Sequence, residues 1–168
     1  DALRAEGAAG LQALFDTHSE LIKQRLIPPP LFGKVAVVDD SWPRLKAALD
    51  AVSKQRDCYA SQLYWFTDFD EAKAAAKASG KPILSLRLLG KLDEEFSCAN
   101  SRFFRTTLYS NRDVSRMLRD AYILHWKSVR PVPRITVDFG DGRKIERTIT
   151  GNSIHYVLDA DGHIIDAL

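Results

Sequence analysis

A helix that leads directly into a buried strand constrains the fold of this chain more than any other feature. The alanine-rich segment from Asp68 to Ser79 is typical of a helix, and Gly80 stands where a left-handed residue closes one. Residues 81–86 (KPILSL) then predict a buried central strand, and the aromatic residues 63–66 predict a strand before the helix. A chain built on such a strand-helix-strand unit is expected to form an α/β sheet.

The rest of the chain extends this unit with further helices, a strand and hairpins. Asn111 is expected to cap one helix, and the glycines of Gly140-Asp-Gly142 mark the turn of a hairpin. The expected elements are helices over 99–107 and 113–120, a strand over 122–126, a hairpin of 134–139 with 144–149, and a hairpin of 154–158 with 163–165. Their order predicts a mixed sheet with helices on both faces.

Amphipathic helices are expected before the sheet. Apolar residues recur at three- and four-residue steps over 8–26, which indicates one buried helical face. A second helix is expected to start where Asp40 or Ser41 caps it, with Pro43 in its first turn. Between the two helices, residues 34–38 (KVAVV) fit either a short strand or a segment laid across the core.

Composition excludes several classes of function. Lysine and arginine number 24 against 22 acidic residues, and no basic run is interleaved with aromatics, so nucleic-acid binding is not expected. No stretch approaches the roughly 20 apolar residues of a membrane helix, so we expect a soluble chain without a membrane span. Cys58 and Cys98 form neither a disulfide framework nor a paired zinc motif. We expect no bound cofactor.

Three stretches of the sequence look like parts of one known family. Residues 65–84 (WFTDFDEAKAAAKASGKPIL) closely resemble the opening of bacterial thioredoxin-like domains, where a helix and Gly-Lys-Pro lead into the central strand. Residues 103–118 resemble the continuation of that family, and residues 157–162 are similar to its terminal hairpin. The resemblance covers residues 63–168. It implies a thioredoxin-like mixed sheet with flanking helices, to which this chain adds an inserted β-hairpin and an N-terminal helical extension.

The resemblance also suggests a division of the chain. Residues 1–57 would form the N-terminal helical extension and residues 58–168 the thioredoxin-like domain. The chain ends on a strand just completed, so we expect this domain to lack the last helix of the family. Cys98-Ala-Asn-Ser101 stands where the family carries Cys-x-x-Cys, and Ser153 stands where its cis-proline should be. Ordinary dithiol reductase activity is therefore not expected.

Cys98 is the candidate reacting group. A cysteine at a helix N-terminus feels the positive end of the helix dipole and unpaired backbone N–H groups, which together stabilise a thiolate. Arg102 and Arg105 follow it by four and seven residues, so they are expected on the same helical face, where they would lower the thiol pKa further. Ser101 is placed to hydrogen-bond the sulfur.

Other residues complete the expected site. A lone thiolate attacks a disulfide but cannot by itself release the mixed disulfide, so a resolving thiol is needed. Cys58 is the internal candidate for that thiol, although a buried small apolar side chain explains it as well. In the resembled fold Asn152 and Ser153 occupy the loop that faces the motif helix. With Asn100 and Arg102, they are expected to bind the substrate.

Three functions remain open from the sequence. The first is thiol/disulfide redox chemistry or redox sensing by Cys98, in the class of thiol-disulfide oxidoreductases. The second is a binding or assembly module without catalysis, whose N-terminal helices and inserted hairpin contact a protein partner. The third is copper binding by Cys98 with His125 or His155, although Cu(I) prefers several sulfur ligands. Resemblance to exported domains favours a periplasmic or extracytoplasmic location over the cytoplasm.

Overall fold

The computed structural model describes residues 2–27 and 41–168. Its helices are α1 (Ala2–Ala5), α2 (Ala8–Thr17), α3 (Ser19–Leu26), α4 (Trp42–Ser53), α5 (Phe69–Ser79), α6 (Ala99–Phe103) and α7 (Arg112–Ala121), with a 3-10 turn η1 (Cys58–Ala60) and a π-helical segment η2 (Phe104–Leu108). Its strands are β1 (Ile83–Leu89), β2 (Ile123–Arg130), β3 (Arg134–Asp138), β4 (Lys144–Thr148), β5 (Ser153–Leu158) and β6 (Ile164–Ala167). Within these ranges, no helix has the length and apolar content needed to cross a membrane.

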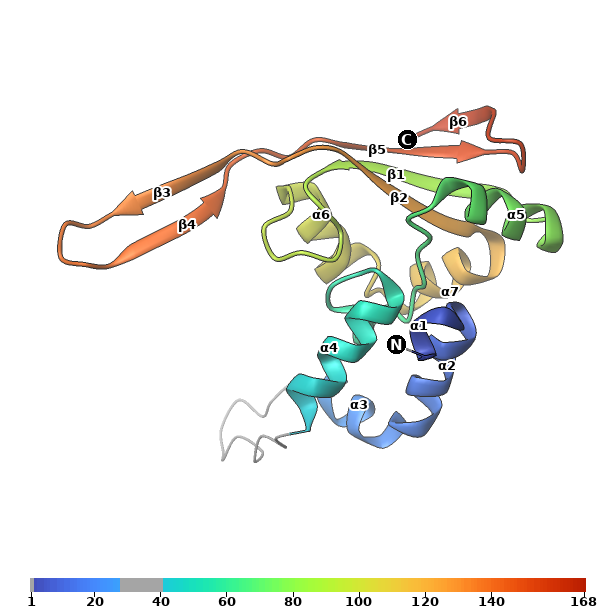
Figure 1. The fold of residues 1–168 in the computed structure, drawn as a ribbon, viewed down its shortest axis with the longest axis horizontal. Coiled ribbons are helices and arrows are strands. Elements are labelled where there is room, and N and C mark those ends of the chain that lie inside the picture. The colour runs from blue at the N-terminus through green and yellow to red at the C-terminus, as the bar shows by residue number, and fades with distance from the viewer. Residues whose placement is uncertain (1, 28–40) are drawn as a thin grey trace.

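Strand β1 lies inside a four-stranded sheet of order β2-β1-β5-β6 (Figure 1). It pairs in parallel with β2 and antiparallel with β5, and β6 pairs antiparallel with β5 at the edge. Parallel neighbours need a crossover connection, which α6, η2 and α7 supply. Ala76 of α5 packs with Ile83 on one face of the sheet, whereas Leu118 of α7 packs with Leu84 on the other. The expected α/β class with a mixed sheet and flanking helices is confirmed.

The main hydrophobic cluster, here called the sheet core, follows from the two-residue period of β1. Leu84, Leu86 and Leu88 all belong to it, together with the buried rings of Trp65 and Tyr109. Cys98 is part of the same cluster. The sheet core therefore reaches from the middle of β1 to the start of α6, where the candidate thiol lies.

Helices α2 to α4 pack around a second cluster, here called the helical core, which includes Leu11, Leu49 and Cys58. The prediction of one continuous helix over 8–26 is wrong, because His18 leaves the helical conformation (φ −114°, ψ 21°) and separates α2 from α3. Pro43 lies in the first turn of α4, as expected. The segment 34–38 and Asp40 lie outside the described residues.

The predicted strand at residues 63–66 is also wrong. Only Phe66 makes an isolated parallel bridge, to His125 of β2. The amide of Trp65 donates to the Ser53 carbonyl at 2.9 Å, and its indole donates to the side chain of Gln55 at 2.7 Å. These bonds tie the segment to the end of α4, so its backbone does not form a ladder along β2.

The helix ends that the sequence predicted do form. Asp68 caps α5 by accepting the amide protons of Asp70 and Glu71, each at 2.9 Å, and Gly80 closes the helix at φ 70°. Asn111 caps α7 through its side-chain oxygen. The helix expected over 99–107 is α6 followed by the wider turn of η2, which continues it to Leu108.

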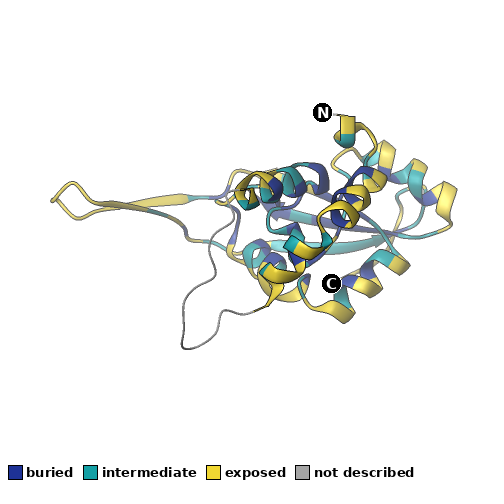
Figure 2. Ribbon diagram, turned by 90° about the horizontal axis from the view of Figure 1, so that it is seen from below, coloured by how far each residue is buried: buried dark blue, intermediate teal, exposed yellow. Residues whose placement is uncertain are grey.

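Strands β3 and β4 form a hairpin that projects from the body as a long arm, exposed along most of its length (Figures 1 and 2). One face carries charges, where Arg134 pairs with Glu146. On the other face, Val137 lies opposite Ile145, and both side chains are exposed. Arg147, opposite Ile135, shares this mainly apolar face. The expected hairpin is thus present, with one polar face and one mainly apolar face.

Candidate functional site

Cys98 lies where the end of β1 meets the start of α6. Its amide donates to the carbonyl of Leu89 at 3.1 Å, and its side chain caps α6 by accepting the Ser101 amide at 3.4 Å. The thiol in turn is within donating distance of Ser101 Oγ, at 3.5 Å, and of the Asn152 carbonyl, at 3.6 Å. The side chain is fully buried.

The loop before β5 covers this thiol. The Ala99 amide donates to the carbonyl of Thr150 at 2.9 Å, and Asn100 Nδ2 donates to Ser153 Oγ at 3.1 Å. Gly151 approaches so closely that an added Cβ would lie 2.4 Å from Asn100 Oδ1. A larger residue at 151 would have to displace the Asn100 side chain, so the loop packs directly on the first turn of α6. The polar residues expected around Cys98 are therefore brought together.

Arg102 connects α6 to the base of the projecting hairpin. Its guanidinium donates to Thr148 Oγ1 at 2.6 Å, and that hydroxyl donates to the Ser97 carbonyl at 3.0 Å. Thr148 is buried although it ends the exposed strand β4. The hairpin base, the residue before Cys98 and the first turns of α6 thus share one hydrogen-bond chain.

The pKa of the Cys98 thiol lies below its ordinary value. Burial opposes ionisation, but hydrogen bonding to the sulfur, with its largest contributions from the Ser101 hydroxyl and the Ser101 amide, outweighs it. In the neutral state the Ser101 hydroxyl donates to the Cys98 carbonyl at 2.9 Å, so it must rotate to donate to a thiolate. Ser101 is therefore the side chain that favours the thiolate.

Arg105 does not tune Cys98 as the sequence suggested. Its side chain is 2% exposed and donates to Asp57 Oδ2 at 3.1 Å. Asp57 also pairs with Lys46 of α4 at 2.6 Å. A π-helical turn changes the angular spacing of residues, and Arg105 lies within η2, so the simple helical projection fails there. Arg105 instead joins the crossover helix to the N-terminal region.

Cys58 lies in the helical core rather than in the sheet core that holds Cys98. Both thiols are free and buried. Burial raises the pKa of Cys58 well above its ordinary value, and its amide donates to Asp50 Oδ1 at 3.0 Å. Cys58 therefore has the surroundings of a small apolar side chain, and its role as a resolving thiol stays a prediction.

The two histidines considered for copper have other partners. The Nδ1 atom of His125 lies 2.8 Å from Ser85 Oγ, and the Nε2 atom of His155 lies 2.6 Å from the hydroxyl of Tyr109. In the part of the chain that the structure describes, no three His, Cys, Asp or Glu side chains are grouped as a metal site. Nothing in the described geometry favours the copper hypothesis.

Sequence reasoning missed three residues of the site. Leu89 accepts from the Cys98 amide and Ser97 accepts from Thr148, both through backbone carbonyls, which carry no side-chain signal. Thr148 belongs to a strand whose β-branched residues look purely structural. The only sequence signal for Thr148 is that it is a polar residue at the end of that strand.

Comparisons of this chain with models of protein families, with curated proteins and with solved structures found no significant match.

Proposed function

We propose that residues 58–168 adopt a thioredoxin-like fold in which Cys98 acts as a single activated thiol. The sheet order β2-β1-β5-β6 supports the fold, with a parallel pair joined by a helical crossover and followed by antiparallel strands. The bridge of Phe66 to β2 stands where a further outer strand would lie. Cys98 at the head of the crossover helix corresponds to the redox motif of that family.

The observation that carries the proposal is the way in which α6 holds the sulfur. The Ser101 amide points at it from the first turn of the helix at 3.4 Å, and the Ser101 hydroxyl lies within reach at 3.5 Å. Both groups can donate to the sulfur, and such hydrogen bonds are stronger to a thiolate than to a thiol, which accepts only weakly and donates its own proton to an acceptor such as the Asn152 carbonyl. The site therefore favours the nucleophilic form of cysteine.

The proposed reaction is thiol-disulfide exchange. The Cys98 thiolate attacks one sulfur of a substrate disulfide, the substrate S–S bond breaks, and the other substrate sulfur leaves as a thiolate. The product is a mixed disulfide on Cys98. Ser101 cannot resolve it, so an external thiol must attack this bond and release Cys98 as a thiolate. The substrate class is a protein or small-molecule disulfide.

Access to Cys98 requires the loop of residues 149–153 to move, since the thiol is fully buried. The loop is held by the Ala99 amide and by the bond between Asn100 and Ser153. Local loop openings of this kind cost less than global unfolding. Asn100 and Ser153 are then the side chains that the incoming substrate meets.

The test is formation of the mixed disulfide in a Cys58→Ser variant. Incubation with an excess of oxidised glutathione is expected to add one glutathione to Cys98, detected by intact mass and removed by a reductant. A Cys58→Ser/Cys98→Ser variant is the matched control and should gain no mass. If Cys98 stays unmodified while the folded protein is intact, the redox proposal fails.

A second candidate is a binding module without catalysis, favoured by the exposed apolar face of the hairpin. Ile135, Val137 and Ile145 share this face, and no other element of the described chain packs over the arm (Figure 2). A lone two-stranded hairpin is marginally stable in water, so a partner that covers this face would stabilise it. This reading requires Cys98→Ser to leave partner binding unchanged.

A further inference from the structure

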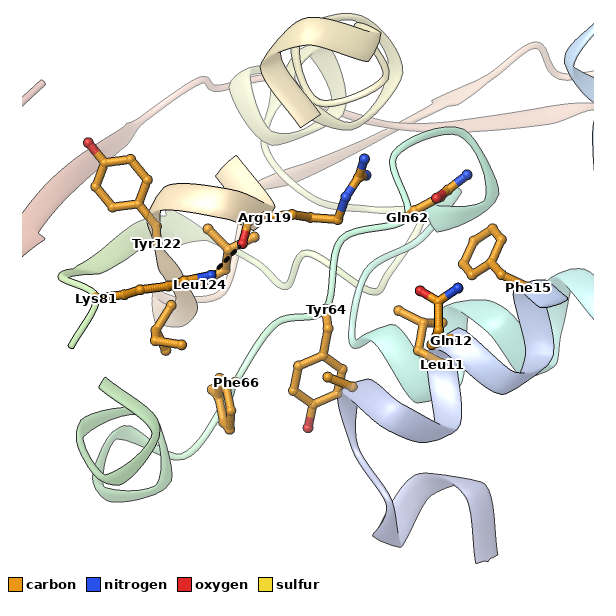
Figure 3. Close-up of a pocket in the computed structure, with 12 residues that line it drawn as sticks. Leu11, Gln12, Phe15, Gln62, Tyr64, Phe66, Lys81, Arg119, Tyr122 and Leu124 are labelled. Atoms are coloured by element: carbon orange, nitrogen blue, oxygen red, sulfur yellow. Dashed lines mark hydrogen bonds between the residues drawn. The ribbon is translucent and has the colours of Figure 1, made fainter. Parts of the chain in front are cut away.

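A cavity of about 240 Å³ lies between the N-terminal helices and the sheet domain, away from the Cys98 site (Figure 3). One wall is formed by Leu11 and Phe15 of α2. The opposite side is formed by residues that flank the sheet, among them Phe66 and Leu124. Ala8, Gln12 and Gln62 also line it and are exposed, so the cavity opens to solvent on that side.

The apolar part of the cavity is rigidly built. The rings of Tyr64 and Phe66 meet edge to face with their centroids 5.1 Å apart. Gly7 packs so tightly on Tyr64 that an added Cβ would lie 3.1 Å from its hydroxyl oxygen. Phe66 is fixed through its backbone, because its amide donates to the Leu124 carbonyl at 2.8 Å. Aromatic rings held in this way offer a preformed apolar surface.

Two cations lie in the other part of the lining. Lys81 Nζ donates to the backbone carbonyl of Arg119 at 3.0 Å, and Figure 3 shows the Arg119 side chain extending from there toward Gln62. The Arg119 guanidinium donates to the Ser61 carbonyl at 2.6 Å. Each bond positions its side chain but uses only one donor, whereas an ammonium has three N–H donors and a guanidinium five. Among the described residues that line the cavity, none is acidic.

A neighbouring cavity strengthens the positive field. It shares Gln62 and Arg119 with the first and is lined in addition by Lys23 and Arg112, again with no acidic residue among the described lining. The described lining itself holds no acidic residue, but acidic residues outside it act on its members. Glu71 acts on the Tyr64 hydroxyl and Asp120 on Arg119, and Lys23 pairs with Glu20 at 2.7 Å. An anionic group is therefore favoured near Arg119 and Lys81, and an apolar group near Phe15 and Phe66.

We propose that this cavity binds a small amphipathic anion, with a carboxylate or phosphate head at Arg119 and Lys81 and an apolar body against α2 and Phe66. This inference does not depend on the redox role of Cys98. The ligand class combines the two chemistries that the lining offers, and neither a neutral apolar molecule nor a fully polar anion uses both.

The test is an NMR titration of the intact protein with octanoate, octyl phosphate and octanol. We expect at least one anion to give saturable shifts at the lining residues, and octanol to bind at least about tenfold more weakly. The comparison of octanoate with octyl phosphate identifies the preferred head group. Equal affinity for octanol, or no saturable shift with either anion, would overturn the proposal.

Variants separate the two halves of the cavity. Lys81→Met and Arg119→Met are each expected to weaken anion binding roughly tenfold, the usual scale for hydrogen bonds to charged groups. Arg116→Met is the matched control, because Arg116 lies on the same helix and pairs with Asp113 outside the cavity. Loss of binding in the control as well would show that only net charge matters.

The apolar half is tested from an exposed position that should tolerate substitution. Ala8→Trp is expected to fill the cavity mouth and abolish binding of the anion, while thermal unfolding stays near that of the parent protein. Retention of binding in this variant would place the ligand elsewhere and contradict the proposal. Since Arg119 also holds the Ser61 carbonyl, this variant keeps the test decisive if Arg119→Met does not fold.

Discussion

At the scale of single residues, Cys98 is defined by segments that are distant in the sequence. Its polar contacts come from Leu89 at the end of β1, from Ser101 in α6 and from Asn152 before β5. The sequence predicts the contact of Ser101 from its place in the first turn of the helix, whereas Asn152 is expected near Cys98 only from the family resemblance. The contacts of Leu89 and of the Asn152 carbonyl cannot be predicted from side chains, because a backbone carbonyl acts whatever side chain the residue carries.

The two arginines that follow Cys98 in the sequence have hydrogen-bond partners that the sequence does not predict. Arg102 and Arg105 were both expected to face Cys98, but Arg102 donates to Thr148 and Arg105 to Asp57. Spacing along a helix predicts which residues share a face only while the helix stays regular. The spacing of residues along a helix also does not predict which acceptor a long side chain reaches. Here Arg102 reaches Thr148 and Arg105 reaches Asp57.

His125 gives a prediction for pH dependence. It is fully buried beside Ser85, and burial, together with the charges of Arg87 and Lys127, lowers its pKa to about 4. The unfolded chain binds a proton near pH 6.5, whereas the folded chain does not until about pH 4, so stability is full above pH 6.5 and declines as pH falls through this window.

The expected loss from His125 is at most about 1.4 kcal/mol per pH unit, measured by urea unfolding between pH 7 and pH 5. His125→Gln should flatten this dependence by removing the titrating group. His163→Gln is the contrasting variant. Its hydrogen bond to Asp159 raises the pKa of His163, so His163 adds stability as pH falls and its removal should not flatten the decline. An unchanged pH slope in His125→Gln would contradict the assigned neutral state.

At the scale of elements, the predicted bounds are most accurate for helices whose ends carry a capping residue or a terminating glycine. Helix α5 has its Asp68 cap and its Gly80 terminus, and helix α7 has its Asn111 cap, so both form near the expected residues. The segment 63–66 has strand-forming residues, but Trp65 bonds to Ser53 and Gln55, and only Phe66 bonds to β2. Tertiary partners of this kind are not visible in local propensity.

The connection between the N-terminal region and the crossover helix gives a second prediction. Asp57 accepts from Lys46 at 2.6 Å and from the buried Arg105 at 3.1 Å, and its backbone is left-handed (φ 61°). Asp57→Asn keeps a residue that tolerates this conformation but removes the charge beside Arg105. We expect a loss of about 2 kcal/mol in the free energy of unfolding, the usual scale for a buried charged donor that loses its partner.

The matched control for this prediction is Asp70→Asn. Asp70 pairs with Lys73 on the exposed surface of α5, where such a pair contributes little. Chemical denaturation should therefore show a much smaller change for Asp70→Asn than for Asp57→Asn. Equal effects of the two substitutions would mean that Asp57 does not join the two regions.

At the scale of the whole molecule, residues 53–66 link the helical core to the sheet core. The Trp126 indole donates to the Lys54 carbonyl at 2.8 Å, and Trp65 bonds to Gln55 at 2.7 Å. These contacts cross the boundary that the sequence placed at residues 57 and 58. The sequence separated the regions because their hydrophobic patterns differ, whereas the contacts between them come from single polar and aromatic groups.

We therefore expect the two cores to unfold together. Chemical denaturation followed by tryptophan fluorescence and by far-ultraviolet circular dichroism should give one coincident transition. A Trp42→Phe variant removes the tryptophan of the helical core and leaves Trp65 and Trp126 as reporters of the sheet core. Separate midpoints for the two probes would show that the N-terminal region unfolds on its own.

If α6 activates the Cys98 thiol as we propose, the pH dependence of its alkylation will show it. In a Cys58→Ser background, the rate with iodoacetamide should report an apparent Cys98 pKa below about 8.5. Ser101→Ala should raise this pKa, whereas Ser110→Ala, which removes a hydroxyl that bonds to the Thr106 carbonyl, should not. A Cys98 pKa at or above the ordinary thiol value, unchanged by Ser101→Ala, would show that α6 does not activate the thiol.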